Sequence, residues 1–420
     1  ATLIGSYGSA MANNQVNAIM LDLDNNQVTF RQADTAKATI DLNTPKGTTY
    51  YFYFRNGGAS SANDATVNFG ASAFTYSIPT GYSKLAQDNI TASDQFISAL
   101  SWIKNRDATD NYMLFDRVRG VTKDLHSNDT TVEVTNENTL KSFLAGGVQI
   151  GEDVEVNTAS ESYVLWNWMM EATGSGSSNE DGSINTTSTL VDTTLGLSIS
   201  TYTGTGSAAT IGHGLGVVPE MIIVKKRAGD SSSSWAIYHK YSDASAPEDK
   251  YLLLDTTGAV ADLAGMWNDT APTSSVFSVG DTQSTNQSSH TYVAYCFAPS
   301  QFISIGAYEG NGNADGAFAP LLNSLGIPLQ PVWALFKNID NGTSGSAWSQ
   351  EDTSRSSTNV MDKVLSPDQT LAEGNWGDMD FVTGGIKQRG TNFVVNNNTI
   401  IYMAIGTPII DTSGRIIAGR

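Results

Sequence analysis

Apolar runs that end in a basic residue recur along the chain and set its organisation. They occupy residues 96–106, 217–227 and 330–338. A second apolar run follows each of them after a variable interval, at residues 162–168, 291–297 and 399–405. When Lys104, Lys225 and Lys337 are placed in register, the repeat is about 110–120 residues long, which is too long for a solenoid unit and suits a small β-domain. The sequence therefore predicts three copies of one β-unit.

Between these runs lie short apolar strands separated by Gly, Asn and Ser, a pattern typical of antiparallel sheets. We therefore expect an all-β fold made of tandem antiparallel β-sandwich modules. One stretch, rich in Gly, Ser, Asn and Thr, is predicted to be a linker between two modules. The predicted parts are a partial sandwich at 1–86, β-repeats at 88–172, 197–298 and 301–406, the linker at 173–196 and a C-terminal tail at 407–420.

The N-terminal region alternates apolar and polar positions. Ile19 and Leu21 fall on one face, and the asparagines at 25–26 turn the chain, so residues 15–31 are predicted to form a β-hairpin. Residues 50–54 are aromatic on both faces. Such a strand suits the centre of a sandwich or an interface between subunits.

Three stretches of this region carry a resemblance to a known family: LDLDNNQVTF at 21–30, NFG at 68–70 and PTGY at 79–82. They resemble the C-terminal half of a SPRY-like, concanavalin-type β-sandwich found in tail-fibre proteins of marine bacteriophages. Later stretches resemble the repeat domains that follow this sandwich in such fibres, at residues 214–219, 271–279 and 292–298.

The resemblance covers most of the chain and implies a structural fibre or spike protein of the virion. It implies a homotrimer, joined to other virion proteins through a region before Ala1. Either that region also holds the first half of the sandwich, or the sandwich of this protein is short. The family carries no catalytic residues to transfer to this sequence. We therefore expect no enzymatic activity and no cofactor.

Charge narrows the range of partners. The chain has 23 Lys and Arg against 42 Asp and Glu, a net charge of −19. Nucleic acids and anionic bilayers need basic side chains to displace their counterions, so neither is an expected partner. No run approaches the roughly 18 apolar residues that cross a membrane. The single cysteine, Cys296, excludes an intrachain disulfide, and its apolar neighbours predict a buried residue.

No metal-ligand or catalytic spacing stands out. The histidines are far apart in the sequence, at His126, His213, His239 and His290. Residues 22–33 begin like a calcium loop, but Gln27 replaces the required glycine and Ala33 the required glutamate. Glu152 and Glu155 would point to opposite faces of a strand, which argues against paired carboxylates for glycoside cleavage.

Two sets of residues are candidates for binding. The most basic patch comprises Lys104, Arg106, Arg117, Arg119 and Lys123. It is a candidate contact for an acidic glycan, with solvated ion pairs to nearby aspartates as the favoured alternative. Exposed loop aromatics give contact area at a low entropic cost. Trp267, Trp348 and Trp376 lie among polar residues and glycine, so they are the candidate ligand-binding residues, with packing of each repeat core as the alternative.

The leading interpretation is a bacteriophage fibre or spike component that mediates attachment to a host receptor. A head fibre or decoration protein fits nearly as well, and a bacterial surface or secreted glycan-binding adhesin is the next alternative. A polysaccharide depolymerase is less favoured. Because the surface is acidic, a neutral glycan or a protein is a better receptor than an anionic glycan, unless a cation bridges the contact.

Overall fold

The computed structural model describes residues 17–22, 27–32, 35–41, 96–171, 174–229, 232–341 and 346–409. The chain divides into two compact units, residues 1–91 and 92–420, and each is described by itself. Almost all regular structure in the described residues is antiparallel strand. The two α helices among them, α1 (Val154–Asn157) and α2 (Ala264–Trp267), are each one turn long. The predicted all-β fold of antiparallel sandwich modules is confirmed.

The first unit contains one antiparallel sheet with the strand order β1-β2-β3. Its strands are β1 (Asn17–Asp22), β2 (Gln27–Gln32) and β3 (Thr35–Asp41). Ile19 pairs with Phe30 and Leu21 with Val28, as the predicted hairpin requires. The predictions for residues 50–54, 68–70 and 79–82 lie outside the described residues, as does most of the predicted tail.

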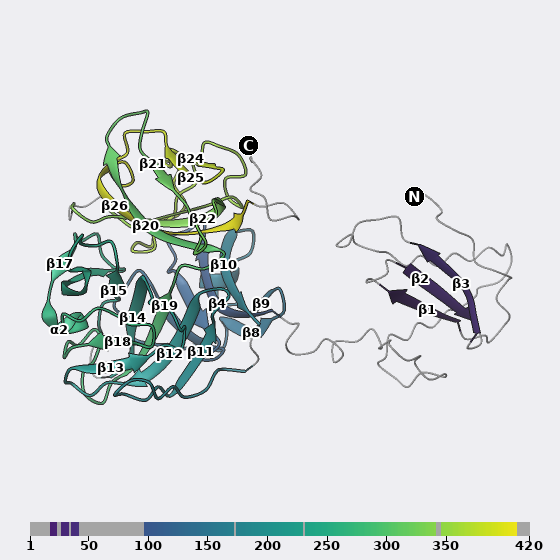
Figure 1. Ribbon diagram of the computed structural model, residues 1–420, viewed down its shortest axis with the longest axis horizontal. Coiled ribbons are helices and arrows are strands. Elements are labelled where there is room, and N and C mark those ends of the chain that lie inside the picture. The colour runs from purple at the N-terminus through teal and green to yellow at the C-terminus, as the bar shows by residue number, and fades with distance from the viewer. Residues whose placement is uncertain are drawn as a thin grey trace. The chain divides into compact units, whose positions relative to one another are not determined.

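The second unit contains three main sheets, one for each repeat (Figure 1). In repeat 1 the order is β10 (Tyr163–Met170), β4 (Ile97–Asn105), β5 (Met113–Asp116), β6 (Lys123–His126) and β7 (Val134–Thr135). In repeat 2 it is β11 (Ser188–Asp192), β12 (Leu197–Thr203), β19 (Thr291–Phe297), β14 (Met221–Ala228), β15 (Ala236–His239), β16 (Lys250–Leu253) and β17 (Ala261–Asp262). In repeat 3 it is β20 (Ile303–Asn311), β26 (Asn397–Pro408), β22 (Leu329–Asn338) and β23 (Ser349–Asp352).

The register is the same in all three sheets. The three lysines have equivalent partners on the closing strand, in the pairs Lys104–Val164, Lys225–Val293 and Lys337–Ile401. On the other side, the equivalent pairs are Leu100–Asp116, Met221–His239 and Trp333–Asp352. The alignment made from the lysines is therefore also a structural alignment, and it identifies equivalent residues throughout the three repeats.

A small second layer covers the outer face of each main sheet. It consists of β8 (Leu140–Leu144) with β9 (Gly147–Ile150), β13 (Ala209–Gly212) with β18 (Val276–Val279), and β21 (Phe318–Pro320) with β25 (Gly385–Gln388) and β24 (Met379–Val382). Each sandwich encloses its own apolar cluster, represented by Phe115, Phe277 and Phe381. Successive side chains of a strand point to opposite faces of the sheet. One face of each main sheet therefore packs on its second layer, and the other face points towards the other two repeats.

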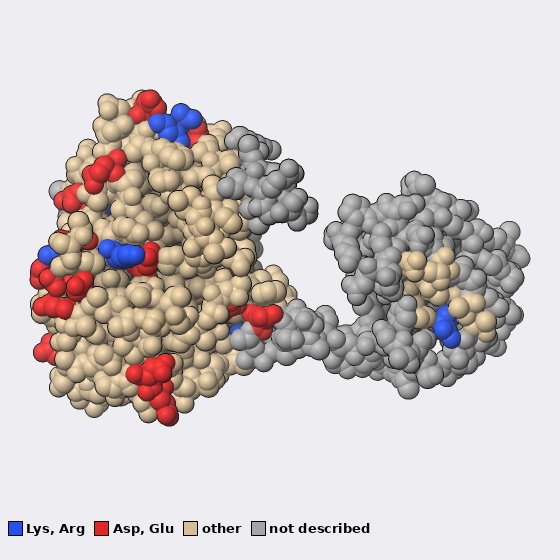
Figure 2. All heavy atoms as spheres, viewed as in Figure 1, with Lys and Arg blue, Asp and Glu red and all other residues tan. Residues whose placement is uncertain are grey.

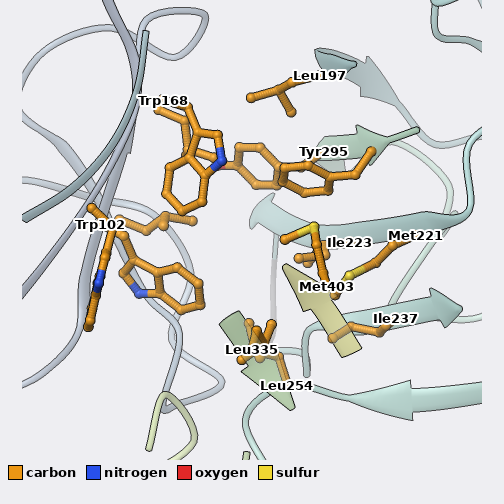
Figure 3. Close-up of a cluster of buried hydrophobic side chains, with 14 of the residues drawn as sticks. Trp102, Trp168, Leu197, Met221, Ile223, Ile237, Leu254, Tyr295, Leu335 and Met403 are labelled. Carbon is orange, nitrogen blue, oxygen red and sulfur yellow. The ribbon is translucent and has the colours of Figure 1, made fainter. Parts of the chain in front are cut away.

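The inward faces of the three sheets enclose a further core that they share (Figure 3). Trp102 and Trp168 come from repeat 1, Tyr295 from repeat 2, and Leu335 and Met403 from repeat 3. The repeats are therefore not separate modules strung end to end, as the tandem order suggested. Buried apolar residues of all three repeats belong to this one cluster.

The segment predicted to be a linker is part of the fold. Residues 188–192 form β11, which pairs with β12 at the edge of the repeat 2 sheet. Its hydroxyl groups satisfy one another inside the sandwich, since Thr189 is bonded to Thr186 at 2.8 Å and to Ser200 at 3.0 Å. Composition misled the prediction because Ser and Thr can be buried when their hydroxyls are paired.

Candidate functional site

The same backbone hydrogen bond occurs at every junction between repeats. The N–H of Glu133 donates to Arg227 O, that of Val260 to Ile339 O, and that of Glu373 to Arg106 O, each at 2.9 Å. Each acceptor is the second residue after the repeat lysine. Repeat 1 thus contacts repeat 2, repeat 2 contacts repeat 3, and repeat 3 returns to repeat 1. The three sandwiches form a closed ring with pseudo-threefold symmetry.

Two of the three tryptophans predicted to bind a ligand are structural. Trp348 is 1% exposed in the shared core and donates its indole N–H to Leu253 O at 3.0 Å. Trp267 is 2% exposed and packs edge-on against Tyr238. The prediction that these two tryptophans are exposed on loops was wrong. Polar residues next to a tryptophan in the sequence are typical of a loop, but here the tryptophan side chain still points into the core.

Trp376 is 39% exposed and is the one of the three that a ligand can reach. Its indole lies against Gly374, where a Cβ would overlap the ring nitrogen. Its backbone carbonyl accepts a hydrogen bond from Asn392 at 3.1 Å. A role for Trp376 in binding stays a prediction.

Ion pairs hold two of the three junctions. At the junction of repeats 1 and 2, Glu133 accepts from Arg227 at 2.8 Å and from Arg119 at 3.3 Å. At the junction of repeats 3 and 1, the equivalent Glu373 accepts from Arg106 at 2.8 Å and Arg355 at 3.3 Å. Two members of the predicted basic patch, Arg106 and Arg119, thus take part in these junctions. Arg119 also pairs with Asp116, one of the nearby aspartates, but both side chains are buried and not solvated as the sequence predicted.

Buried carboxylates strengthen the same two junctions. Asp116 pairs with the fully buried Arg119 and accepts from the Tyr295 hydroxyl of repeat 2 at 2.7 Å. Asp352 pairs with Arg355 and accepts from the Trp166 indole of repeat 1 at 3.0 Å. Both aspartates face an aromatic donor from the neighbouring repeat, so each junction is locked by a charge-assisted contact.

The junction between repeats 2 and 3 has neither feature. Val260 and Ile339 take the places of the glutamate and the arginine. His239 takes the place of the aspartate, and it is 1% exposed. Its Nε2 donates to Tyr402 O at 3.3 Å, and its Nδ1 accepts from the Tyr241 N–H at 3.2 Å. Burial lowers the pKa of His239 to about 4, so the ring is neutral at pH 7.

A surface groove of about 330 Å³ lies at this third junction, and we call it the 2–3 groove. Repeat 2 contributes Glu220 and Tyr241, and repeat 3 contributes Gly306 and Tyr402. Apolar side chains complete its walls, among them Pro299, Pro320 and Leu322. A Cβ on Gly306 would overlap the Tyr402 hydroxyl, so glycine is needed here for the tyrosine to reach the groove.

The polar groups of the 2–3 groove are positioned by their neighbours. Glu220 pairs with Lys240, whose ammonium lies 5.6 Å from the centre of the Tyr241 ring. Tyr402 donates its hydroxyl to Pro320 O at 2.9 Å. Burial raises the pKa of Tyr402 to about 12, so this hydroxyl remains a proton donor at pH 7. The groove thus combines apolar walls and aromatic rings with a carboxylate and a hydroxyl.

The other sequence predictions have these outcomes in the described residues. Cys296 is fully buried, as predicted, and burial raises the pKa of its thiol. No group of three or more His, Cys, Asp or Glu side chains in the described part of the chain is arranged to hold a metal ion. Among the described helices, none is long and apolar enough to cross a membrane.

Comparison with known proteins gives one match. A family model described as "Domain of unknown function (DUF7483)" matches residues 70–407, which include the whole ring. No curated protein and no solved structure matches the chain. Because the match covers most of its length, the chain belongs to the DUF7483 family of domains of unknown function.

Proposed function

We propose that the chain is a structural component of a bacteriophage fibre or spike and attaches the virion to a neutral saccharide on the host surface through the 2–3 groove. Assembly into a homotrimer and attachment to other virion proteins are part of this proposal. The sequence resemblance to marine phage tail fibres supports the virion assignment. The groove supplies the binding role.

The observation that carries the binding role is the difference between the junctions. Ion pairs stabilise two junctions of the ring. At the third junction, the apolar residues Val260 and Ile339 take their place, and a groove opens to the surface. The ring has pseudo-threefold symmetry, and one junction differs from the other two in its side chains. Ligand binding at that junction would leave the ion pairs of the other two intact. The 2–3 groove lies at that junction.

The chemistry of the groove suits a sugar ring. The Tyr241 side chain is 38% exposed and offers an aromatic surface to the apolar C–H groups of a pyranose. The Glu220 carboxylate and the oxygen of the Tyr402 hydroxyl, whose proton is donated to Pro320 O, can accept hydrogen bonds from sugar hydroxyls. The described residues on the face shown in Figure 2 are mostly uncharged, and the chain as a whole is acidic. A neutral saccharide carries no charge for such a surface to repel.

Two measurements test the proposal. Immunogold electron microscopy with antibodies against the chain should label a fibre or spike on the particle. Pre-incubation of host cells with the purified chain should block adsorption of the phage. Labelling confined to the host cytoplasm, or undiminished adsorption at saturating chain, would reject the proposed function.

Variants localise the binding. Tyr241→Ala should reduce the block of adsorption about tenfold or more, because loss of one stacking aromatic costs roughly 1–3 kcal/mol. Leu371→Ala is the matched control, since Leu371 is 58% exposed and lies outside the groove. Loss of the block in Trp376→Ala and not in Tyr241→Ala would place the receptor site at Trp376 instead.

A further inference from the structure

Arg117 directly follows β5 in repeat 1, and each of the other two repeats has a residue at the equivalent position. The Arg117 N–H donates to Ala99 O at 2.9 Å, just as that of Lys240 donates to Glu220 O at 2.9 Å and that of Thr353 donates to Val332 O at 3.0 Å. The three pairs are therefore structural equivalents. A positively charged side chain stands at this position in repeats 1 and 2 and a neutral one in repeat 3.

The repeats differ in what faces this position. In repeat 2 the Lys240 ammonium forms an ion pair with the Glu220 carboxylate. In repeat 3 both partners, Thr353 and Val332, are uncharged. In repeat 1 the place of the glutamate is taken by Ala99. Repeat 1 has therefore kept the cation and lacks the anion that neutralises it in repeat 2.

The Arg117 guanidinium is buried without compensation. The residue is 8% exposed, and its Nε, Nη1 and Nη2 atoms are buried and have no hydrogen-bond partner among the described residues. Burial lowers its pKa, and no carboxylate opposes that effect. A guanidinium nevertheless stays charged in proteins. The neighbouring Arg119, by contrast, is fully buried but bonded to Asp116 and to backbone carbonyls.

We propose that Arg117 is the centre of a binding site for a small oxyanion, such as phosphate, between the positions of Ala99 and the guanidinium. The planar fork of N–H donors matches two oxygens of an oxyanion. The alanine replaces the side chain that supplies this negative charge in repeat 2. The bound oxyanion does in repeat 1 what Glu220 does in repeat 2. This site is independent of the 2–3 groove and of the proposed attachment role.

Thermal unfolding of the full-length chain tests the site. Sodium phosphate is titrated against sodium HEPES at constant ionic strength and pH, with sodium chloride as a second arm. The wild-type Tm should rise by roughly 3–5 °C once phosphate is well above its Kd. A Tm that does not respond to phosphate would overturn the proposal, and an equal response to chloride would overturn the assignment of an oxyanion.

Three variants place the effect at Arg117. R117M should abolish the response to phosphate. A99E supplies an internal carboxylate, as in repeat 2, and should also abolish it while leaving the arginine in place. K250M is the matched control, since Lys250 belongs to a solvent-exposed pair with Asp262, and it should respond like the wild type. If R117M does not fold, A99E decides, and a wild-type response in either variant would contradict the proposed site.

Discussion

Arg106 and Glu373, 267 positions apart in the chain, are joined by side-chain hydrogen bonds of 2.9 and 2.8 Å and by a backbone bond of 2.9 Å. This contact connects the last repeat to the first. It turns a tandem array into a ring in which each sandwich has two neighbours. The stability of each repeat is thereby tied to that of the other two.

Removing this contact should weaken the whole ring. Glu373→Ala leaves Arg355, whose side chain is 2% exposed, with one carboxylate partner fewer. We expect the free energy of unfolding to fall by about 3 kcal/mol, as for other buried pairs broken on one side. Urea denaturation measures the change. The control is Lys250→Ala, which removes a solvent-exposed pair with Asp262 and should have little effect.

A substitution at one position in the shared core should stabilise the fold. Gln350 is fully buried, and within the described part of the chain neither its Nε2 nor its Oε1 has a hydrogen-bond partner. The equivalent residues are Leu114 and Ile237. Gln350→Leu should therefore raise the free energy of unfolding by about 1–2 kcal/mol. Gln388→Leu is the contrasting variant and should destabilise, because Gln388 donates to the Tyr308 hydroxyl at 2.9 Å.

Acid should weaken the junction of repeats 2 and 3. The pKa of His239 is about 4 in the fold against 6.5 for an ordinary histidine, so between these values only the unfolded chain binds the proton. The free energy of unfolding must then fall as pH drops from 6.5 to 4, by up to about 3 kcal/mol. His239→Gln should flatten this part of the pH profile. An unchanged slope in the variant would contradict the assignment.

Mild alkali should strengthen the fold, by the same sign of proton linkage as at His239. Burial lowers the pKa of Lys104, Lys225 and Lys337 from 10.5 to about 8. Between pH 8 and 10 the folded chain therefore loses protons that the unfolded chain keeps, and the free energy of unfolding should rise with pH. Lys225→Met should reduce this slope when denaturation is followed across that range. A variant slope equal to that of the wild type would exclude a lowered pKa at Lys225.

The three lysines show how far sequence reasoning reaches. Their spacing predicted the repeats and the register, and the short apolar strands between them predicted the all-β fold class. Their environment could not be read from the sequence, because each ammonium is satisfied by backbone carbonyls. Lys225 donates to Ser233 O at 2.6 Å and to Asp129 O of repeat 1, and Lys337 reaches Thr257 O of repeat 2 at 3.0 Å. Every residue type has a backbone carbonyl, so the sequence does not show which residues accept these hydrogen bonds. The closure of the ring could therefore not be predicted from the sequence.

The binding residues were harder to predict for a related reason. The 2–3 groove joins Glu220 and Tyr241 to Gly306 and Tyr402, which are brought together only by the ring. The one available signal was a mismatch among aligned repeats. Position 239 is histidine where the other repeats have aspartate at 116 and 352. Comparison of repeats at that position would have pointed to the third junction.

Native-state hydrogen exchange at the amides of Glu133, Val260 and Glu373 tests the ring most directly. These three N–H groups form the equivalent bonds that close it. Exchange should occur at all three with the same free energy, equal to that of global unfolding, and Glu373→Ala should lower it at all three together. Exchange with three different free energies, or a loss of protection in Glu373→Ala that is confined to residue 373, would show that the repeats open independently and would contradict a closed ring.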